Sequence, residues 1–350
     1  MSRRTATLLV AGALLLACVG VALLLPVPFV TTSPGPTVDT LGSTGDRPVV
    51  RIEGRRTYPT RGELELTTVR VSSPGSRLSL VEAVRAWFDP DRELLPRDVV
   101  YPPEESVAQV ERENAEQMQT SQQDAVVAAL REVGVSVPRT VVVQSIVRGA
   151  PALGRLQAGD TIRAVNGRSI TAPEQVGAAL QSTPPGETAR FRVVREGSTT
   201  TVVTPTEAAE DDPDLTMVGI AVGVGYDLPF EVNIDVGADI GGPSAGTMFA
   251  LAIVDKLTPG ALTGGAVVAG TGAISYNGVV GEIGGIQQKI VGAADSGADI
   301  FLVPRSNCAE ALGADADDMR LVQVATLRGA VSALEALAED PGASVPECAA

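Results

Sequence analysis

A serine on a glycine-rich turn is the residue of this sequence best placed for nucleophilic chemistry. Ser244 lies in GGPSAG (residues 241–246), directly before an apolar helical pattern. The two glycines allow a tight turn, and proline suits the first position of a helix. Free backbone amides at such a helix start can stabilise an oxyanion, which makes Gly242, Pro243 and Ala245 the candidate turn and oxyanion residues. Alone, the motif is equally compatible with a strand-to-helix turn that serves only packing.

The proton acceptor for this serine cannot be histidine, because the sequence contains none. Of 27 basic residues only Lys256 and Lys289 are lysines, and arginine does not lose its proton in proteins. Lys256 lies 12 residues along the helix that Ser244 begins, so the two backbones are about 18 Å apart. Lys289 follows a double glycine near the start of another helical segment, where the helix dipole and burial would both lower its pKa. We therefore predict Lys289 as the general base and acid.

The segment that carries these residues, 215–340, alternates strand and helix patterns. This alternation predicts a layered α/β domain, followed by a tail over 341–350. With no histidine and no close cysteine pair, zinc has no plausible ligand set, and the acidic stretches lack the ligand spacing of a calcium loop. We expect neither a metal nor a cofactor.

Residues 136–206 have a different character, with short β patterns between a small-residue turn and the GD and NG turns. The succession GAPA, LQAGD and VNG resembles a bacterial PDZ domain, a small β-rich fold. That resemblance implies that peptide termini bind by adding a strand to a sheet edge. We place its carboxylate-binding loop at Val133–Val135 as a hypothesis. The alternative is a small sandwich that only stabilises its neighbour.

The segment before the PDZ-like region is divided into a linker over 31–46 and a region over 47–135 that holds two alternating runs and two helices. The two runs predict a hairpin, which is marginal alone and should pair with other strands. We expect 62–71 to pair with part of 215–240. The PDZ-like region would then be an insertion in the α/β domain.

An uncharged run from Thr5 to Leu25 predicts a helix long enough to cross a membrane, with residues 1–30 forming a cytoplasmic stub and anchor. Arg3 and Arg4 precede it, which places the start in the cytoplasm and the body outside. A cleaved signal sequence is the alternative. LLLAC, ending at Cys18, resembles a lipoprotein box, but the following residues stay apolar, which favours a plain membrane cysteine.

The net charge of −15 and an aromatic content of 3% argue against nucleic acid as a partner, because both phosphate attraction and stacking platforms are missing. In an exported body, Cys308 and Cys348 form a candidate disulfide. Closing about 40 residues would contribute on the order of 4 kcal/mol in the chain-entropy model. Two separate thiols remain the alternative.

GGPSAG, followed by GTGAISYNGVVGEIGGIQQK, resembles the peptidase domain of Lon proteases. The resemblance implies a Ser-Lys dyad of Ser244 and Lys289, with Thr271 helping to orient the lysine. The whole arrangement resembles membrane-anchored Lon-like PDZ proteases of bacteria, which implies polypeptide substrates and a homo-oligomer, a hexamer. Gly241 and Ala273 stand where Lon has acidic residues, and no Walker A loop is present, so we expect an ATP-independent endopeptidase. A catalytically inactive PDZ scaffold or adaptor at the membrane surface is the alternative.

Overall fold

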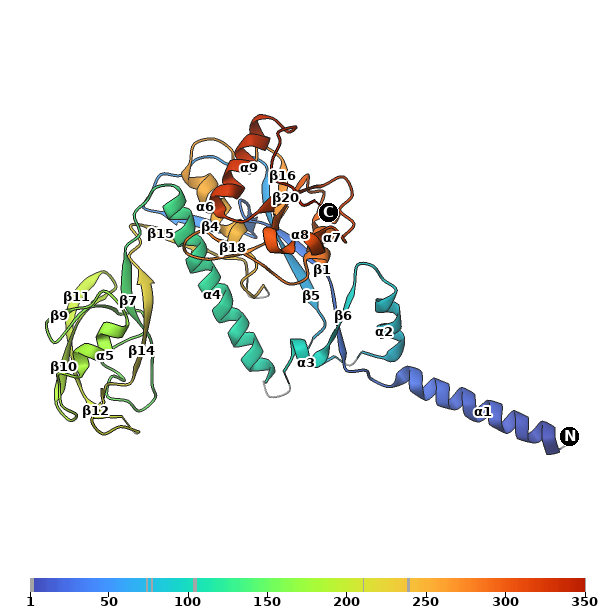
Figure 1. Ribbon diagram of the computed structural model, residues 1–350, viewed down its shortest axis with the longest axis horizontal. Coiled ribbons are helices and arrows are strands. Elements are labelled where there is room, and N and C mark those ends of the chain that lie inside the picture. Colours follow the sequence, from blue (N-terminus) through green and yellow to red (C-terminus); the bar gives the residue numbers. More distant parts are fainter. Residues whose placement is uncertain are drawn as a thin grey trace. The chain divides into compact units, whose positions relative to one another are not determined.

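The chain forms two compact units, one of which is inserted into the other (Figure 1). The computed structural model describes residues 3–349 except 74, 77, 103–105, 210 and 238–239. The discontinuous unit comprises residues 1–135 and 230–350, and the inserted unit comprises Ser136–Pro229. The inserted unit therefore extends past the predicted boundary at 206, and the segment 215–229 belongs to it rather than to the α/β domain.

A mixed six-stranded sheet forms the centre of the discontinuous unit, in the order β20-β19-β16-β5-β1-β6. The strand β5 pairs in parallel with β16 and antiparallel with β1. Its Leu64 and Leu66 on one face and its Glu65 and Thr67 on the other are all buried, which fits a central strand with layers on both faces. The bounds are β1 Phe29–Asp39, β5 Glu63–Val71, β6 Glu93–Pro96, β16 Val267–Gly270, β19 Ile300–Pro304 and β20 Arg320–Val324.

The segment predicted as a linker over 31–46 is instead mostly strand β1. The sequence SPGPT reads as a turn, but the structure uses it as a bulge, with the register to β5 shifting between Pro34 and Thr37. Prolines lack an N–H and are tolerated at bulges, and a Cβ at Gly35 would collide with Thr68. Because turn-forming residues lie inside this strand, the sequence pattern did not predict it.

The predicted hairpin over 47–71 is also wrong, because its two runs pair with different partners. Strand β4 (Val50–Glu53) pairs with β15 (Glu231–Ile234), and β5 pairs with β1 and β16. The expected pairing of 62–71 with part of 215–240 does not occur; it is 50–53 that pairs there. Alternation of apolar residues identifies a strand but not its neighbour. Short pairs complete the unit: β2 (Ser43–Thr44) with β3 (Arg47–Pro48), and β17 (Ala273–Ile274) with β18 (Val280–Gly281).

Helix α6 (Gly246–Leu257) packs on β5 and is covered by two further helices, α4 (Val107–Glu132) and α9 (Leu327–Glu339). All residues from Gly246 to Asp255 are buried, which fits a helix that is apolar all round. The polar first half of α4 is mostly exposed, and its second half is buried. Helix α7 (Ile286–Ser296) lies against β1 and β5. The next two elements are η1 (Arg305–Asn307) and α8 (Cys308–Ala311).

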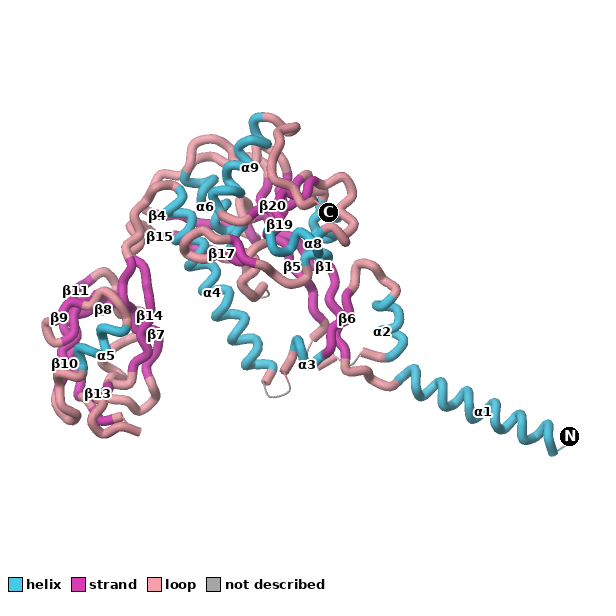
Figure 2. The backbone as a smooth tube through the Cα atoms, in the orientation of Figure 1, coloured by secondary structure: helices cyan, strands magenta, loops and turns pink. Residues whose placement is uncertain are grey.

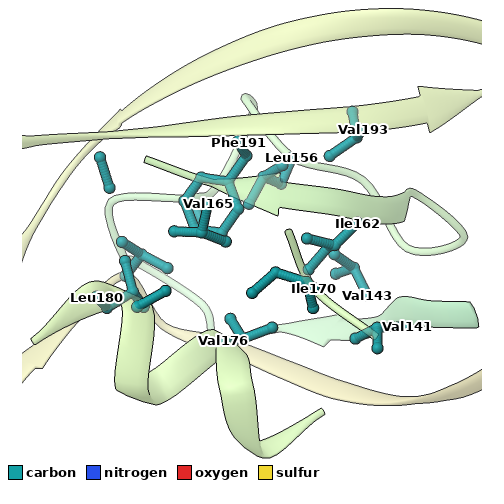
Figure 3. Close-up of a cluster of buried hydrophobic side chains, with 14 residues drawn as sticks. Val141, Val143, Leu156, Ile162, Val165, Ile170, Val176, Leu180, Phe191 and Val193 are labelled. Carbon is teal, nitrogen blue, oxygen red and sulfur yellow. The ribbon is translucent and has the colours of Figure 1, made fainter. Parts of the chain in front are cut away.

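The inserted unit is a β sheet in the order β11-β10-β8-β7-β14 with one short helix, α5 (Glu174–Leu180). Its core is a cluster of buried apolar side chains that includes Phe191, Val165 and Leu180 (Figure 3). Residues 133–135, the hypothetical carboxylate loop, lie at the end of α4 in the discontinuous unit. The strands are β7 Arg139–Ile146, β8 Thr161–Val165, β9 Arg168–Ser169, β10 Thr188–Arg195, β11 Ser198–Pro205, β12 Glu207–Ala208, β13 Thr216–Met217 and β14 Ile220–Tyr226.

The first helix, α1 (Arg3–Leu24), extends away from the rest of the discontinuous unit (Figure 2). By length and composition it can cross a membrane, a property that signal sequences share. Two short helices follow later in the chain, α2 (Leu80–Trp87) and α3 (Arg97–Val100). At the other end of the chain, a disulfide joins Cys308 to Cys348. Next to it, the backbone of Glu347 forms an isolated β-bridge with Val322 of β20. The tail over 341–349 is therefore attached to the sheet.

Candidate active site

The turn that carries Ser244 is held by the long helix α4. Gly242 has a φ of 85°, in the left-handed region that favours glycine, and its N–H donates to the carbonyl of Asn114 (3.2 Å). The hydroxyl of Ser121 donates to the carbonyl of Pro243 (2.9 Å). Two residues on one face of α4 thus fix the backbone on the N-terminal side of the serine.

On its other side, the serine is held through its own carbonyl oxygen. This oxygen accepts the N–H of Gly272 (2.8 Å) and the hydroxyl of Thr271 (3.0 Å). Thr271 is completely buried, so its hydroxyl requires this acceptor. The structure thus shows Thr271 holding the backbone of Ser244, and its implied role in orienting the lysine stays a prediction.

Lys289 lies in the first turn of α7, and its side chain reaches the serine. The amine nitrogen Nζ is 3.0 Å from Oγ of Ser244 and 2.8 Å from the carbonyl oxygen of Thr67 on β5. Helix α7 approaches β5 closely because Gly285, in the left-handed region at φ 69°, has no Cβ; one there would lie 2.9 Å from Val69. The glycine before the helix brings the amine within reach of both partners.

The environment of Lys289 favours the neutral amine. The residue is 3% exposed, and burial lowers the pKa of Lys289 from 10.5 to about 8. A neutral amine can donate one N–H to the Thr67 carbonyl while its lone pair accepts the proton of the Ser244 hydroxyl. The predicted contribution of burial is present in the structure. The arrangement can therefore activate a serine near neutral pH.

The backbone amides near Ser244 are not equally available to an oxyanion. The N–H of Gly242 is engaged with Asn114, and Pro243 has no N–H, so these two residues shape the turn and are not donors. Ala245 precedes the first residue of α6, where amides have no acceptor within the helix. Of the three candidates, Ala245 alone suits the role of donor.

A cleft of about 510 Å³ opens onto Ser244 and Lys289. It is lined by residues of β5 and by apolar residues such as Met118 and Ile240. Lys256, the other lysine, lies elsewhere, with its Nζ donating to the carbonyl of Leu41 (3.3 Å). The site therefore contains one of the two lysines, as the helix geometry predicted.

Several residues of this site carry no sequence signal. The backbone carbonyl of Thr67 contacts Lys289, and that of Asn114 contacts Gly242. The hydroxyl of Ser121 contacts the carbonyl of Pro243. A backbone carbonyl leaves no signature in the residue type that carries it. Only the apolar alternation of β5 and the helical period of 107–132 indicated ordered elements there.

Two family models match this chain. The C-terminal proteolytic domain of Lon protease (S16) matches residues 232–329, a range that includes Ser244, Thr271 and Lys289. This chain contains a Lon proteolytic domain. A PDZ domain model matches residues 108–206. The predicted mixed α/β fold with a PDZ domain is thereby confirmed. The PDZ match begins within α4, whereas contacts place α4 with α6 in the Lon-type unit and give the PDZ unit the bounds 136–229.

Individual proteins are similar to parts of this chain. The peroxisomal Lon protease homolog 2 of Caenorhabditis elegans is 38% identical over 96 residues, which is 27% of this chain and 12% of the nematode protein. The PDZ unit is similar to the solution structure of GtR34C from Geobacillus thermodenitrificans (27% identity, 23% of this chain and 94% of that one, TM-score 0.22). It is also similar to the PDZ domain of an SdrC-like protein from Listeria innocua (23% identity, 24% and 92%, TM-score 0.22).

Proposed function

We propose that this chain is an ATP-independent serine endopeptidase in which Ser244 is the nucleophile and Lys289 the general base. The observation that carries the proposal is the 3.0 Å separation of Nζ and Oγ combined with a pKa of about 8 for the buried amine. Nucleophile and base lie within hydrogen-bond reach, and a second group, the Thr67 carbonyl, orients the base. The match to the Lon proteolytic domain supports the same reaction class.

The proposed reaction has two steps. Neutral Lys289 takes the proton of Ser244 as Oγ bonds to the substrate carbonyl carbon, and the amide of Ala245 donates to the oxyanion. The C–N bond then breaks, and the lysinium returns the proton to the leaving amine. In the second step, Lys289 deprotonates a water, which attacks the acyl-enzyme and releases the carboxylic acid while the proton returns to Oγ of Ser244.

Substrates of this reaction would be flexible or already unfolded polypeptides. The sequence contains no Walker A loop, so ATP-driven unfolding has no basis in this chain. The cleft beside Ser244 is partly lined by residues 66–70 of β5, and β16 pairs only with residues 63–66 of this strand, so main-chain groups beyond Leu66 can face an extended segment. An extended segment must be free of its own secondary structure to use them.

The PDZ unit would recruit or regulate substrates by binding peptide termini. Among the described strands, β14 pairs only with β7, so its other edge is open for an added strand. Gln181 after α5 exchanges two hydrogen bonds with the backbone of Thr216, which ties α5 to the segment that enters β14. We therefore place the peptide along β14, with the carboxylate near the turn at Gly219 instead of at 133–135. A peptide with a free carboxylate should bind more tightly than its amidated form.

The N-terminal helix α1 would serve as a membrane anchor, with the body outside the cytoplasm. Its length and composition permit a span, and Arg3 and Arg4 are the basic residues at its start. The disulfide between Cys308 and Cys348 agrees with an oxidising compartment. The Lon resemblance implies a homo-oligomer, and we propose a hexamer. We propose no nucleic-acid partner, because the net charge of −15 does not favour one.

The experiment incubates an unfolded protein substrate with the full chain in detergent and follows fragments by mass spectrometry. We expect cleavage by the unaltered chain and none by Ser244→Ala or Lys289→Ala. Lys256→Ala, which removes the other lysine, serves as the matched control and should retain cleavage. If Ser244→Ala cleaves as fast as the unaltered chain, the proposal is wrong. Binding of peptides without any cleavage would instead favour the scaffold alternative.

A further inference from the structure

Three large apolar side chains of the discontinuous unit are strongly exposed, two at the end of α2 and one on α3. Phe88 is 81% exposed, Trp87 is 76% exposed and Val99 is 71% exposed. They are the most exposed large apolar residues outside α1 in the part of the chain that the structure describes, and Val84 adds a fourth side chain that is 48% exposed. A folded protein rarely leaves its tryptophan and a neighbouring phenylalanine in water without a partner.

The exposed face is a regular feature of a well-formed helix. On α2, Ala83 and Ala86 are buried, while Val84, Trp87 and Phe88 follow a spacing of three and four residues on another face. Ser79 and Glu82 form a capping box that fixes the start of the helix. The apolar face is therefore presented by an ordered element.

Both helices are attached to the few residues that follow α1. Pro26 forms an isolated β-bridge with Ser79. The N–H of Val27 donates to the carbonyl of Leu78 (2.8 Å), directly before α2. The N–H of Arg97, the first residue of α3, donates to the carbonyl of Pro28 (3.0 Å). Wherever the C-terminal end of α1 lies, the starts of α2 and α3 lie beside it.

We propose that α2 and α3 form a membrane-surface contact, in which Trp87, Phe88 and Val99 insert into the interfacial region of the bilayer that α1 enters. This inference rests on the proposed anchoring by α1. Tryptophan is favoured at this depth because its ring is apolar and its N–H can still reach water or headgroups. The contact would restrain the proteolytic unit against the surface, so that the segment 25–28 does not act as a free tether.

Charge decides which lipid the contact would use. The stretch 80–98 contains five acidic and three basic residues, and the whole chain carries −15. Neither balance attracts anionic headgroups, so the contact depends on apolar insertion. Zwitterionic phosphatidylcholine should therefore be sufficient, and added anionic lipid should not strengthen the contact.

The sequence supplies its own probe, because Trp87 is the only tryptophan. The full chain is reconstituted into phosphatidylcholine vesicles with or without brominated acyl chains, and the fluorescence emission of Trp87 is recorded. The same emission is then measured with added acrylamide, a quencher that stays in water. We expect a shift of the emission to shorter wavelength, loss of intensity with brominated lipid and weak quenching by acrylamide. Strong quenching by acrylamide with no effect of bromine would overturn the inference. Protection from both quenchers would indicate a protein partner, such as a second copy, and would also overturn it.

A pair of variants separates the surface contact from other causes. Phe88→Ser combined with Val99→Ser keeps the tryptophan and should shift its emission back toward that of an exposed indole. Val203→Ser, which changes a half-exposed valine of the PDZ unit, is the matched control and should leave the emission unchanged. Cleavage of an unfolded substrate in detergent should be the same in all three chains, because none of these residues lies at the cleft.

Carbonate extraction distinguishes failure of the anchor from failure of the contact. A chain that carbonate removes from vesicles would refute both. A chain that stays in the membrane but shows an exposed Trp87 would refute only the contact. Loss of proteolysis with an intact bromine signal would instead count against the proposed enzyme.

Discussion

Replacing Lys289 by methionine should stabilise the protein below about pH 8 while removing its activity. Lysine and methionine side chains have similar length, but methionine carries no charge into the buried site. Burial lowers the pKa of Lys289 from 10.5 to about 8, so the folded state pays to hold the charged amine. The same group that would perform the chemistry is thus a cost to folding at low pH.

The size of this cost follows from the shift. One pKa unit corresponds to about 1.4 kcal/mol, so a shift from 10.5 to about 8 lowers the free energy of unfolding by roughly 3 kcal/mol below about pH 7, where both states are protonated. Between the two pKa values the unfolded chain binds more protons than the folded one, so stability rises with pH. Near pH 9.5 roughly 1 kcal/mol of the cost remains. The lost hydrogen bond to Thr67 removes about 1 kcal/mol at either pH.

We therefore expect Lys289→Met to gain about 2 kcal/mol near pH 6 and about nothing near pH 9.5. Both chains should carry Ser244→Ala to prevent self-digestion. Urea unfolding is followed by circular dichroism in the helix band, which reports mainly the discontinuous unit because it holds all the described α-helices except α5. The change of about 2 kcal/mol between the two pH values is the decisive quantity, because the hydrogen-bond loss cancels in it. A stability difference that is the same at both pH values would refute the lowered pKa.

Three further predictions concern the pH profile, the disulfide and the turn. The kcat/KM for an unfolded substrate should rise about tenfold per pH unit below the pKa of Lys289, about 8, and then level, because only the neutral amine accepts a proton; a flat profile from about pH 6 to 9 would contradict this. Cys348→Ser should lower the free energy of unfolding by about 4 kcal/mol through loss of the bond to Cys308, measured by urea unfolding, and reductant should then have no further effect. Ser121→Ala should lower stability by about 1 kcal/mol and reduce kcat more than it changes KM, because its hydroxyl holds the turn that positions the nucleophile, whereas Thr120→Ala on the exposed side of the same helix should do neither.

The sequence already indicated Ser244 and Lys289 as the proposed pair, because chemistry limits which residue types can act as nucleophile and base. Without histidine, and with only two lysines, the choice of base reduced to the distance along one helix. The same reasoning failed for residues that act through their backbone, such as Thr67 and Asn114. Thr271 was assigned to the lysine by resemblance, and the hydrogen bond of its hydroxyl to the carbonyl of Ser244 was not predicted.

The order of helices and strands after residue 230 was readable for a similar reason. Periodicity of apolar residues records which face of an element is buried, and these elements follow each other without interruption. The strand over 29–39 was not predicted, because its prolines and glycine occupy a bulge within the strand. Strand β14 was assigned to the wrong unit because its pattern does not say which sheet it joins.

By itself, the sequence determined the apolar helix, predicted over residues 5–25, the PDZ and Lon resemblances, and the choice of Ser244 and Lys289 as the proposed pair. The tertiary structure decided which strands are neighbours, that the PDZ unit extends to residue 229, and that a carbonyl of β5 and a hydroxyl of α4 complete the site. The division has a physical cause. Residue type and spacing encode local conformation and intrinsic reactivity, whereas strand pairing and backbone contacts arise between segments some 200 residues apart, such as Thr67 and Lys289.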